Sequence, residues 1–476
     1  MRSRRILLAL LPLTLAACPT RPPKGPDAPI VPPQAALDVI TITFLATTDI
    51  HGHVEAETEH APRGAGKEVD LTRGGLPLLA GYVANARAAH PGRVVLLDSG
   101  DMMQGTLVSN LGEGRAVVRA MNAMGYAAAA VGNHEFDYGP VGPAVLVQRA
   151  EDDPRGALKA RAAEARYPWL SSNLVDEKGG PFAPGVRAFT VVEVDGVKVG
   201  IVGGTSEDTP HTTLAPNLVG VRVLPLSSSI GKAAAEARAA GATVVVAVVH
   251  EGGECRKNDR ADDLSSCKDD APIFQLARAL PPGTVDAIFA GHTHQAVAHR
   301  VAGVPVLQAW SNARAFSRLD LLVDRRSGRP VPDGARIFPP EDVCAAIAHG
   351  VGPCRDMGVR KNETRPATYE GREVVADAQV AAWGLVGVVH GAALEVSRTA
   401  PIGWETRVEV IARSIGQMAG VGLVVGMLAE VADELRDGIA PATKPGCIKF
   451  SPTCWRMPAV IPRRAPASMF SARSSR

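Results

Sequence analysis

The sequence reads Gly132-Asn133-His134-Glu135-Phe136-Asp137-Tyr138-Gly139 directly after a run of small apolar residues, 126–131. The apolar run predicts a buried strand. The glycines at both ends of the octapeptide indicate a sharp loop at the carboxyl end of that strand. Loops in this position carry the catalytic groups of α/β proteins. The pattern therefore predicts an α/β fold with a functional loop at 132–139.

Asn133 and His134 are adjacent in this loop, and adjacent side chains of an extended chain point to opposite sides. One of the two can therefore face a metal while the other faces a substrate. Asp137 follows three residues after His134 and can return to its side, where a carboxylate would orient the imidazole and favour its protonated form. We expect His134 and Asp137 to form a catalytic pair. The alternative is a polar loop with a hydrogen-bonded histidine.

Other predicted strands end in the same kind of residue. These strands lie at 38–46, 93–97, 243–249 and 285–290. Asp49 and His51 are two residues apart, as are His292 and His294, so an extended backbone would project each pair to one side. A carboxylate and an imidazole on one side make half of a metal site. The candidate metal ligands from all five strand ends are Asp49, His51, Asp101, Asn133, His250, His292 and His294.

The segments between these strands complete an alternating pattern. Helices are predicted at 74–90, 115–124 and 230–240, and further strands at 167–174, 188–194, 198–203, 304–309 and 319–323. Asp195-Gly196 predicts a hairpin turn. The polar segment 55–72 predicts a loop. Such alternation of strands and helices is typical of the α/β class.

Composition places the chain among globular proteins. It has 476 residues, of which 46% are apolar and 21% charged, so the length favours two or more domains. The formal net charge of +2 gives no indication of a nucleic-acid partner.

The amino terminus predicts export. Three arginines within the first five residues precede an apolar stretch at 6–17, which is typical of a secretory signal. The signal, residues 1–18, ends in Leu-Ala-Ala-Cys18, which resembles a lipoprotein processing box and implies lipidation of the Cys18 thiol. The alternative is an ordinary signal with an incidental cysteine. Residues 19–36 contain seven prolines and predict an extended tether. We therefore expect a lipoprotein anchored to a membrane and facing the periplasm or the cell exterior.

Six cysteines remain after Cys18, namely Cys255, Cys267, Cys344, Cys354, Cys447 and Cys454. An even number in an exported chain favours disulfides, and pairs of sequence neighbours are the simplest arrangement among fifteen. The alternative is a metal site, but the sequence contains no Cys-x-x-Cys.

Together, the strand-end residues resemble those of the calcineurin-like metallophosphoesterases. The matching elements are Asp49-x-His51, Gly100-Asp101, Gly132-Asn133-His134-Glu135, His250 and Gly291-His292-x-His294. Within that superfamily, the octapeptide and the preceding segment 121–126 resemble the 5'-nucleotidase and 2',3'-cyclic phosphodiesterase family. The resemblance covers roughly residues 40–324.

This resemblance implies a four-layer α-β-β-α sandwich over residues 37–340, with two divalent metals at the carboxyl ends of the strands. It implies that one metal is held by Asp49, His51 and His294, and the other by Asn133, His250 and His292. Asp101 would bridge the two metals. Zn, Mn, Co and Fe all suit this mixture of nitrogen and oxygen ligands.

The implied function is that of an exported phosphohydrolase that releases phosphate from nucleotides or related phosphate esters. Metal-activated water would attack phosphorus, while His134, with Asp137 behind it, would stabilise the transferring group or protonate the leaving oxygen. Two alternatives stay open. One is a sulfur-oxidation hydrolase on the same fold, and the other is a non-catalytic surface lipoprotein that binds a metal or a partner.

The carboxyl-terminal region departs from the family. The family normally adds a second domain with an Asn-Gly-Gly-x-Arg-like motif, and this chain has no Asn-Gly-Gly. We therefore expect residues 341–476 to be a truncated or divergent region. Residues 441–476 contain six prolines, seven Lys or Arg and no acid, a composition that predicts a disordered tail.

Overall fold

The computed structural model describes residues 38–62 and 68–381. All described residues belong to one compact unit. The signal at 1–18 with its lipidated Cys18, the tether at 19–36 and the tail at 441–476 lie outside the described residues and stay predictions.

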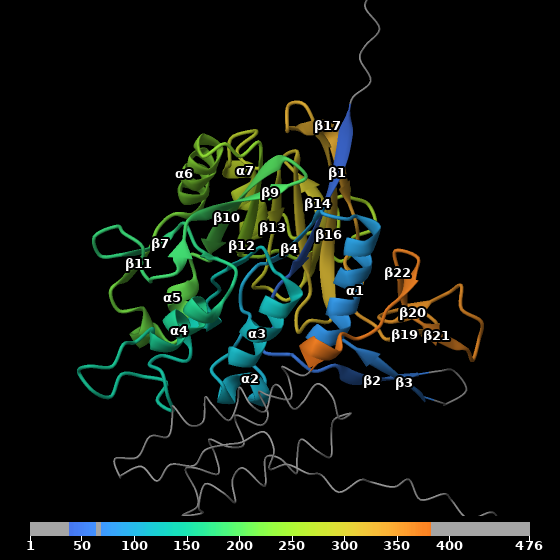
Figure 1. Cartoon of the computed structure of the whole chain (residues 1–476), viewed down its shortest axis with the longest axis horizontal. Helices are drawn as coiled ribbons and strands as arrows, with labels where there is room; N and C mark the ends of the chain where they lie inside the picture. Colours follow the sequence, from blue (N-terminus) through green and yellow to red (C-terminus); the bar gives the residue numbers. More distant parts are fainter. Residues whose placement is uncertain (1–37, 63–67, 382–476) are drawn as a thin grey trace, which may run out of the picture. The chain divides into compact units, whose positions relative to one another are not determined.

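Two sheets form the centre of the described unit (Figure 1). The first has the order β17-β16-β1-β4-β5-β6-β8, with β18 paired to β16. Its strands are β1 (Val39–Thr47), β4 (Val94–Asp98), β5 (Ala128–Ala130), β6 (Trp169–Leu170), β8 (Val186–Arg187), β16 (Ala315–Asp324), β17 (Pro330–Ile337) and β18 (Glu341–Asp342). Strands β1, β4, β5 and β6 run parallel, so their carboxyl ends meet at one edge.

The second sheet has the order β14-β15-β13-β12-β10-β9. Its strands are β9 (Phe189–Val194), β10 (Val197–Thr205), β12 (Val244–His250), β13 (Ala287–Phe289), β14 (Ala296–Val301) and β15 (Val304–Ala309). Strands β10, β12, β13 and β15 are parallel. The hairpin predicted at Asp195-Gly196 is confirmed, because β9 and β10 pair in antiparallel fashion across it.

Helices cover the outer face of each sheet. The helices are α1 (Leu76–Ala89), α2 (Leu107–Leu111), α3 (Arg115–Met124), α4 (Gly156–Glu164), α5 (Thr209–Thr212), α6 (Leu226–Ala239) and α7 (Pro272–Ala279), with short 3-10 turns η1 (His134–Phe136) and η2 (Ala215–Leu218). One core cluster joins the first sheet to α1, α3 and α4, and another joins the second sheet to α6 and α7. A third cluster, including Phe44 and Val246, lies between the sheets. The predicted four-layer α-β-β-α sandwich is therefore confirmed.

The apolar sequence of the central strands explains the two-sheet core. Each residue of β12 is buried, because helices cover one face of its sheet and the other sheet covers the second. The two sheets approach each other closely where β6 faces β10. A Cβ atom at Gly203 would lie 2.2 Å from the Cβ of Leu170, so only glycine fits there.

Smaller strands extend the structure beyond the sandwich. They are β2 (Glu57–Pro62) and β3 (Glu68–Arg73), β7 (Leu174–Asp176) and β11 (Val221–Val223), β19 (Ala346–His349), β20 (Arg355–Asp356) and β21 (Thr364–Pro366), and β22 (Thr368–Tyr369) and β23 (Arg372–Glu373). The predicted loop at 55–72 is wrong, since β2 and β3 form a hairpin there. Its charged side chains gave no alternating apolar pattern. Residues beyond 340 also pack on the first core cluster, through Ala348 and Tyr369 among others.

Two disulfides confirm the neighbour pairing of four cysteines. Cys255 is bonded to Cys267, and Cys344 to Cys354. The remaining pair, Cys447 and Cys454, lies outside the described residues. The alternative of a cysteine metal site therefore does not apply to the four described cysteines.

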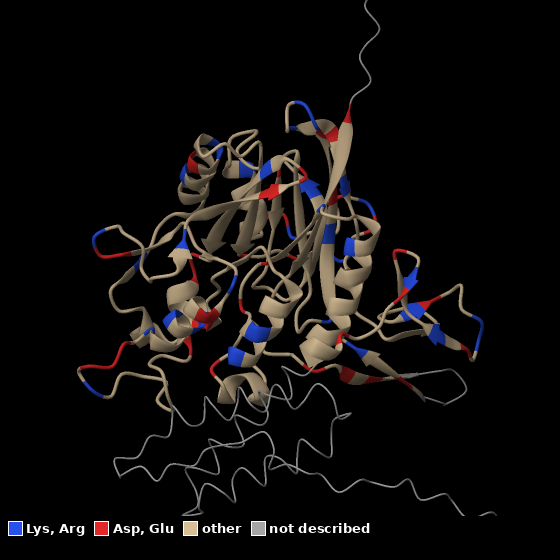
Figure 2. Ribbon diagram, viewed as in Figure 1, with Lys and Arg blue, Asp and Glu red and all other residues tan. Residues whose placement is uncertain are grey.

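The surface of the described part carries both signs of charge. Figure 2 shows Lys and Arg interspersed with Asp and Glu over helices and loops alike. Among the described helices, none has the length and apolar character needed to cross a membrane.

Candidate metal centre

Six of the seven predicted ligands lie in turns that follow the parallel strands, and the seventh, His250, is the last residue of β12. Five of the seven have a positive φ, between 49° and 74°, and these are Asp49, His51, Asp101, His292 and His294. Such values are uncommon for residues other than glycine and concentrate at functional sites. The expectation that an extended backbone projects each pair is therefore wrong. β1 ends at Thr47, and a left-handed turn directs the side chains that follow it.

One set of ligands, here named the outer group, consists of Asp49, His51 and His294. The Nε2 atoms of His51 and His294 are 2.9 Å apart, and Nε2 of His294 is 3.4 Å from Oδ1 of Asp49. The Asp49 side chain is fully buried, whereas that of His294 is 45% exposed. Nδ1 of His51 lies 2.8 Å from the carbonyl oxygen of Gln104, which fixes the ring and leaves Nε2 facing its neighbours.

A second set, the inner group, consists of Asp101, Asn133, His250 and His292. Nε2 of His250 is 3.0 Å from Oδ2 of Asp101 and 2.9 Å from Oδ1 of Asn133. The His250 and His292 rings lie 5.0 Å apart. Nδ1 of His250 is 2.8 Å from the carbonyl oxygen of Ser99. The His250 side chain is wholly buried, and these contacts hold both of its ring nitrogens.

Asp101 stands between the two groups. Its Oδ2 is 3.0 Å from Nε2 of His250 and 3.8 Å from Nε2 of His51. Its Oδ1 accepts a hydrogen bond from the backbone N–H of His134 at 2.9 Å. A Cβ atom at Gly132 would lie 2.1 Å from this Oδ1, so the carboxylate requires glycine there.

The donor set fits divalent cations. A neutral His250 that donates from Nδ1 to Ser99 presents an unprotonated Nε2 to two oxygen acceptors, those of Asp101 and Asn133. Three acceptors that face one another are stable only around a shared cation, either a proton or a metal. Burial opposes protonation of His250, but the neighbouring Asp101 carboxylate outweighs it and raises the pKa of His250 to about 10. Protein nitrogen and oxygen ligands converge here as a transition metal requires.

His134 and Asp137 form the contact predicted from their spacing. Nδ1 of His134 lies 2.5 Å from Oδ2 of Asp137, and this hydrogen bond raises the pKa of His134. Thr213 donates to the other carboxylate oxygen at 2.6 Å and holds it in place. Asn133 has φ −77° and ψ −33°, so it is not extended as expected, and η1 begins at the next residue. The His134 side chain is 33% exposed and can reach a bound molecule.

Sequence reasoning missed a buried carboxylate beneath the ligands. Glu135 is fully buried and accepts hydrogen bonds from the backbone N–H groups of Asp101, Met102 and Gly132, at 2.7–2.9 Å. Burial, reinforced by Asp101, raises the pKa of Glu135 to about 7. This side chain ties two ligand-bearing loops together. Its position directly after Asn133 and His134 was the available signal.

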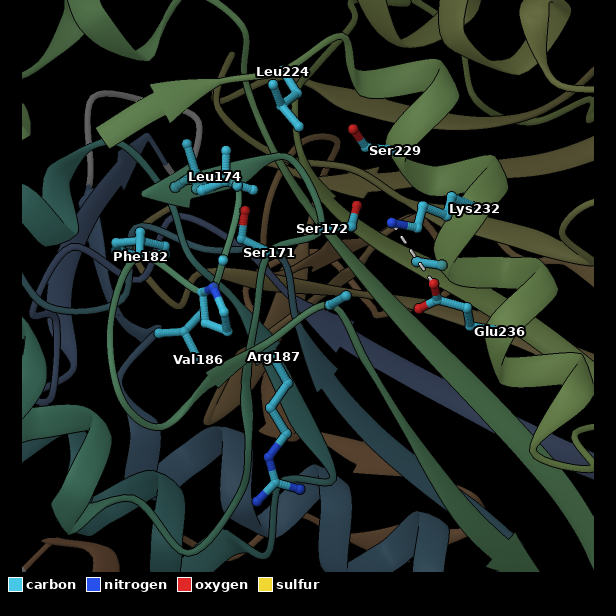
Figure 3. A pocket seen from close by; sticks show the side chains of 16 residues that line it. Ser171, Ser172, Leu174, Phe182, Val186, Arg187, Leu224, Ser229, Lys232 and Glu236 are labelled. Atoms are coloured by element: carbon cyan, nitrogen blue, oxygen red, sulfur yellow. Dashed lines mark ion pairs between the residues drawn. The ribbon is translucent and has the colours of Figure 1, made fainter. Parts of the chain in front are cut away.

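One pocket in the described part lies away from these ligands. It has a volume of about 230 Å³ and lies between α6 and the segment 171–188. In Figure 3, Lys232 and Glu236 of α6 form an ion pair on one side, and Phe182 and Val186 lie on the other. None of the predicted ligands lines it. The candidate centre is therefore a separate site, built at the strand ends.

Comparison with known proteins identifies the family to which this chain belongs. Residues 42–296 match the family model described as calcineurin-like phosphoesterase. The match covers more than half of the chain and contains all seven predicted ligands together with His134 and Asp137. The chain therefore belongs to the calcineurin-like phosphoesterase family, whose members are metal-dependent phosphohydrolases.

Relatives within this class include 5'-nucleotidases. The 5'-nucleotidase of Bos taurus is 35% identical over 175 residues, which are 36% of this chain and 27% of that protein. Cell wall protein Lmo0130 of Listeria monocytogenes is 27% identical over 318 residues, 64% of this chain and 40% of that protein. The chain thus matches less than half the length of either relative.

A solved structure shares the fold. The crystal structure of the calcineurin-like phosphoesterase YfkN from Bacillus subtilis aligns with a TM-score of 0.52 at 20% identity. The alignment covers 76% of this chain and 100% of that chain.

Proposed function

We propose that this chain is an exported phosphohydrolase with two divalent metal ions, which releases phosphate from nucleotides or related phosphate esters. The observation that carries the proposal is the convergence of the outer and inner groups on Asp101. Similarity to 5'-nucleotidases supports a nucleotide as substrate.

The two groups would hold one ion each. Asp49, His51 and His294 would bind the first, Asn133, His250 and His292 would bind the second, and Asp101 would touch both. Bound there, divalent ions would supply positive charge that neutralises the phosphate oxygens and makes a water molecule more acidic. Zn, Mn, Co and Fe all suit these ligands.

The residues beside the two groups would act on the leaving group. A protonated His134 can donate from Nε2 to the leaving oxygen or stabilise negative charge on the phosphate, because Asp137 already occupies its Nδ1. Asp137 is itself fixed by Thr213. Glu135 accepts hydrogen bonds from both Asp101 and Gly132 and so fixes their two loops relative to each other. The ligands would therefore be in position before substrate binds.

A metal-exchange assay tests this function. The purified full chain is treated with a chelator and assayed for inorganic phosphate released from AMP, 2',3'-cyclic AMP and p-nitrophenyl phosphate. Activity should disappear and return with Mn, Co or Zn. Full activity in a metal-free preparation would refute the proposal. A protein that binds these metals yet releases no phosphate would fit the two alternatives considered above, the sulfur-oxidation hydrolase and the non-catalytic lipoprotein.

Export and lipid anchoring are part of the same proposal. The sequence of residues 1–18 and the similarity to a cell wall protein support export. Cleavage before Cys18 would place the lipid at the start of the proline-rich tether. Mass spectrometry of the mature amino terminus tests this, and an unmodified terminus at another residue would exclude the anchor.

A further inference from the structure

The surface beside His134 is apolar. Two loops form it, 140–147 and 214–219, and we name this surface the apolar shelf. Loop 140–147 reads Pro-Val-Gly-Pro-Ala-Val-Leu-Val and contains no polar side chain. Loop 214–219 has one polar residue, Asn217, which is buried. Surface loops are ordinarily polar, so this composition needs a reason.

Exposed apolar side chains of the described part concentrate on this shelf. Six of the thirteen large ones belong to it: Val141, Val145, Leu146, Val147, Leu214 and Val219, which are 37–68% exposed. Single exposed apolar residues are normal on protein surfaces, whereas a gathered group marks a binding surface.

Hydrogen bonds hold the two loops together and attach them to the catalytic pair. Nδ2 of Asn217 donates to the carbonyl oxygen of Val145 at 3.0 Å and to that of Phe136 at 2.8 Å. The backbone N–H of Leu214 donates to Oδ1 of Asp137 at 3.3 Å. Asp137 in turn holds His134. The shelf is therefore attached to the catalytic pair through Asp137, the residue that holds His134.

From this attachment we infer that the shelf binds the leaving group of the substrate, and that the preferred substrates are phosphate monoesters of alcohols with an apolar body. The inference rests on the proposed function, in which His134 acts at the leaving oxygen. The part of the alcohol beyond that oxygen then extends over the shelf. The attraction would come from removing apolar area from water on both partners.

This contact would lower KM more than it changes kcat. The apolar body touches the shelf before and during phosphate transfer, so it stabilises bound substrate and transition state alike. Full burial of one methylene is worth about a fourfold change in binding, and an open surface gives a fraction of that. From ethyl to octyl phosphate we expect KM to fall at least about 10-fold, with kcat within about threefold.

The test uses the full metal-loaded chain with ethyl, butyl, hexyl and octyl phosphate, all below micelle-forming concentrations, and AMP for comparison. Val145→Ser/Val147→Ser should reduce the ethyl-to-octyl change in KM to less than about threefold, because KM for the longer esters rises. These side chains are exposed, and the carbonyl of Val145 that binds Asn217 is retained. The matched control is Val351→Ser/Met357→Ser, which alters side chains that are 76% and 65% exposed on another part of the surface.

Each remaining outcome is decisive. A flat chain-length series in a protein that hydrolyses all esters with metal would overturn the shelf and leave the proposed function standing. A chain-length effect that survives in the shelf variant would place the apolar contact elsewhere and also overturn the inference. Absence of hydrolysis from every ester would instead refute the proposed function. If the shelf variant alone converts a dimer into a monomer on gel filtration and KM is unaffected, the shelf is an interface between copies and not a substrate surface.

Discussion

The inner and outer groups contain similar ligands, but the protein holds them differently. In the inner group, the His250 side chain is wholly buried, and its Nδ1 is fixed by the Ser99 carbonyl. In the outer group, the His294 side chain is 45% exposed, and its hydrogen bond to Asp49 raises its pKa. The inner group is therefore preformed at His250 and is the more buried of the two, with His292 as its one partly exposed ligand, whereas His294 of the outer group is exposed. We expect the inner group to bind its ion more tightly and to exchange it more slowly.

The largest effect is expected where the two groups meet. Asp101→Ala removes the one carboxylate that faces both His51 and His250. It also frees the backbone N–H of His134 from its acceptor. kcat/KM should fall at least about 10³-fold, since charge stabilisation is lost at both ions. The measurement is phosphate release together with metal content by mass spectrometry. Retention of both ions with nearly normal turnover would remove Asp101 from its proposed place.

The second prediction separates the groups directly. His250→Ala should reduce kcat/KM at least about 10-fold more than His294→Ala, because it disrupts the preformed group. His294→Gln should restore most of the activity lost in His294→Ala, since an amide oxygen can still bind a metal. His299→Ala is the control for loss of a buried histidine, as His299 bonds to the Lys257 carbonyl away from both groups. Equal losses of kcat/KM in His250→Ala and His294→Ala would contradict the expectation that the inner group is better preorganised than the outer group.

The same contrast shows what the sequence reveals about the site. Asp and His after buried strands identify the ligands, because the apolar runs of β4 and β12 are long enough to define where each strand ends. The carbonyls of Ser99 and Gln104 that fix the rings carry no sequence signal, since every residue has one. The positive φ values at Asp49 and His292 could not be predicted from the sequence either. Glycine is the residue type that indicates a positive φ, and these positions are not glycine.

Elements of the fold were predictable to the extent that apolar periodicity defined them. β1, α1 and α3 were predicted nearly to their ends, since one face of each is apolar. The strand predicted at 167–174 is reduced to β6, Trp169–Leu170, and β7 begins at Leu174. The β2–β3 hairpin was missed because charged residues dominate it. Its stability comes from pairing and from the bridge between Arg73 and Cys344, which no local pattern reports.

The third prediction concerns His134, which touches both groups without belonging to either. Its backbone N–H binds Asp101, and its ring lies 5.4 Å from that of His51. His134→Ala should keep both ions bound but lower kcat about 10²-fold, as expected for a lost acid or charge-stabilising group. Metal content and turnover measured on one sample test this. An unchanged kcat would remove His134 from the mechanism, and loss of an ion would make it a positioning residue for the inner group.

The fourth prediction is a pH effect. The hydrogen bond to Asp137 raises the pKa of His134, so the protonated ring persists to higher pH than for an isolated histidine. If the protonated ring acts, activity is present below this pKa and is lost as pH rises through it. Asp137→Asn keeps an oxygen for Thr213 but removes the charge, so the alkaline limb of kcat should move to lower pH. The acidic limb, which reports the ligands, should stay in place. An unmoved alkaline limb would show that another group controls it.

The smallest effect is expected from the carboxyl-terminal residues. The described part already contains all seven predicted ligands, the catalytic pair and the apolar shelf, and residues up to Val380 pack on its core. Deletion of residues 384–476 should therefore change kcat/KM for nucleotides less than about threefold, a change too small to reflect a lost catalytic group. Discrimination among the bases should be weak before and after deletion, since no cage for the base is evident in the sequence. Kinetics are measured for AMP, GMP, CMP and UMP before and after the deletion. A sharp base preference that disappears on deletion would show that the deleted residues form a specificity element.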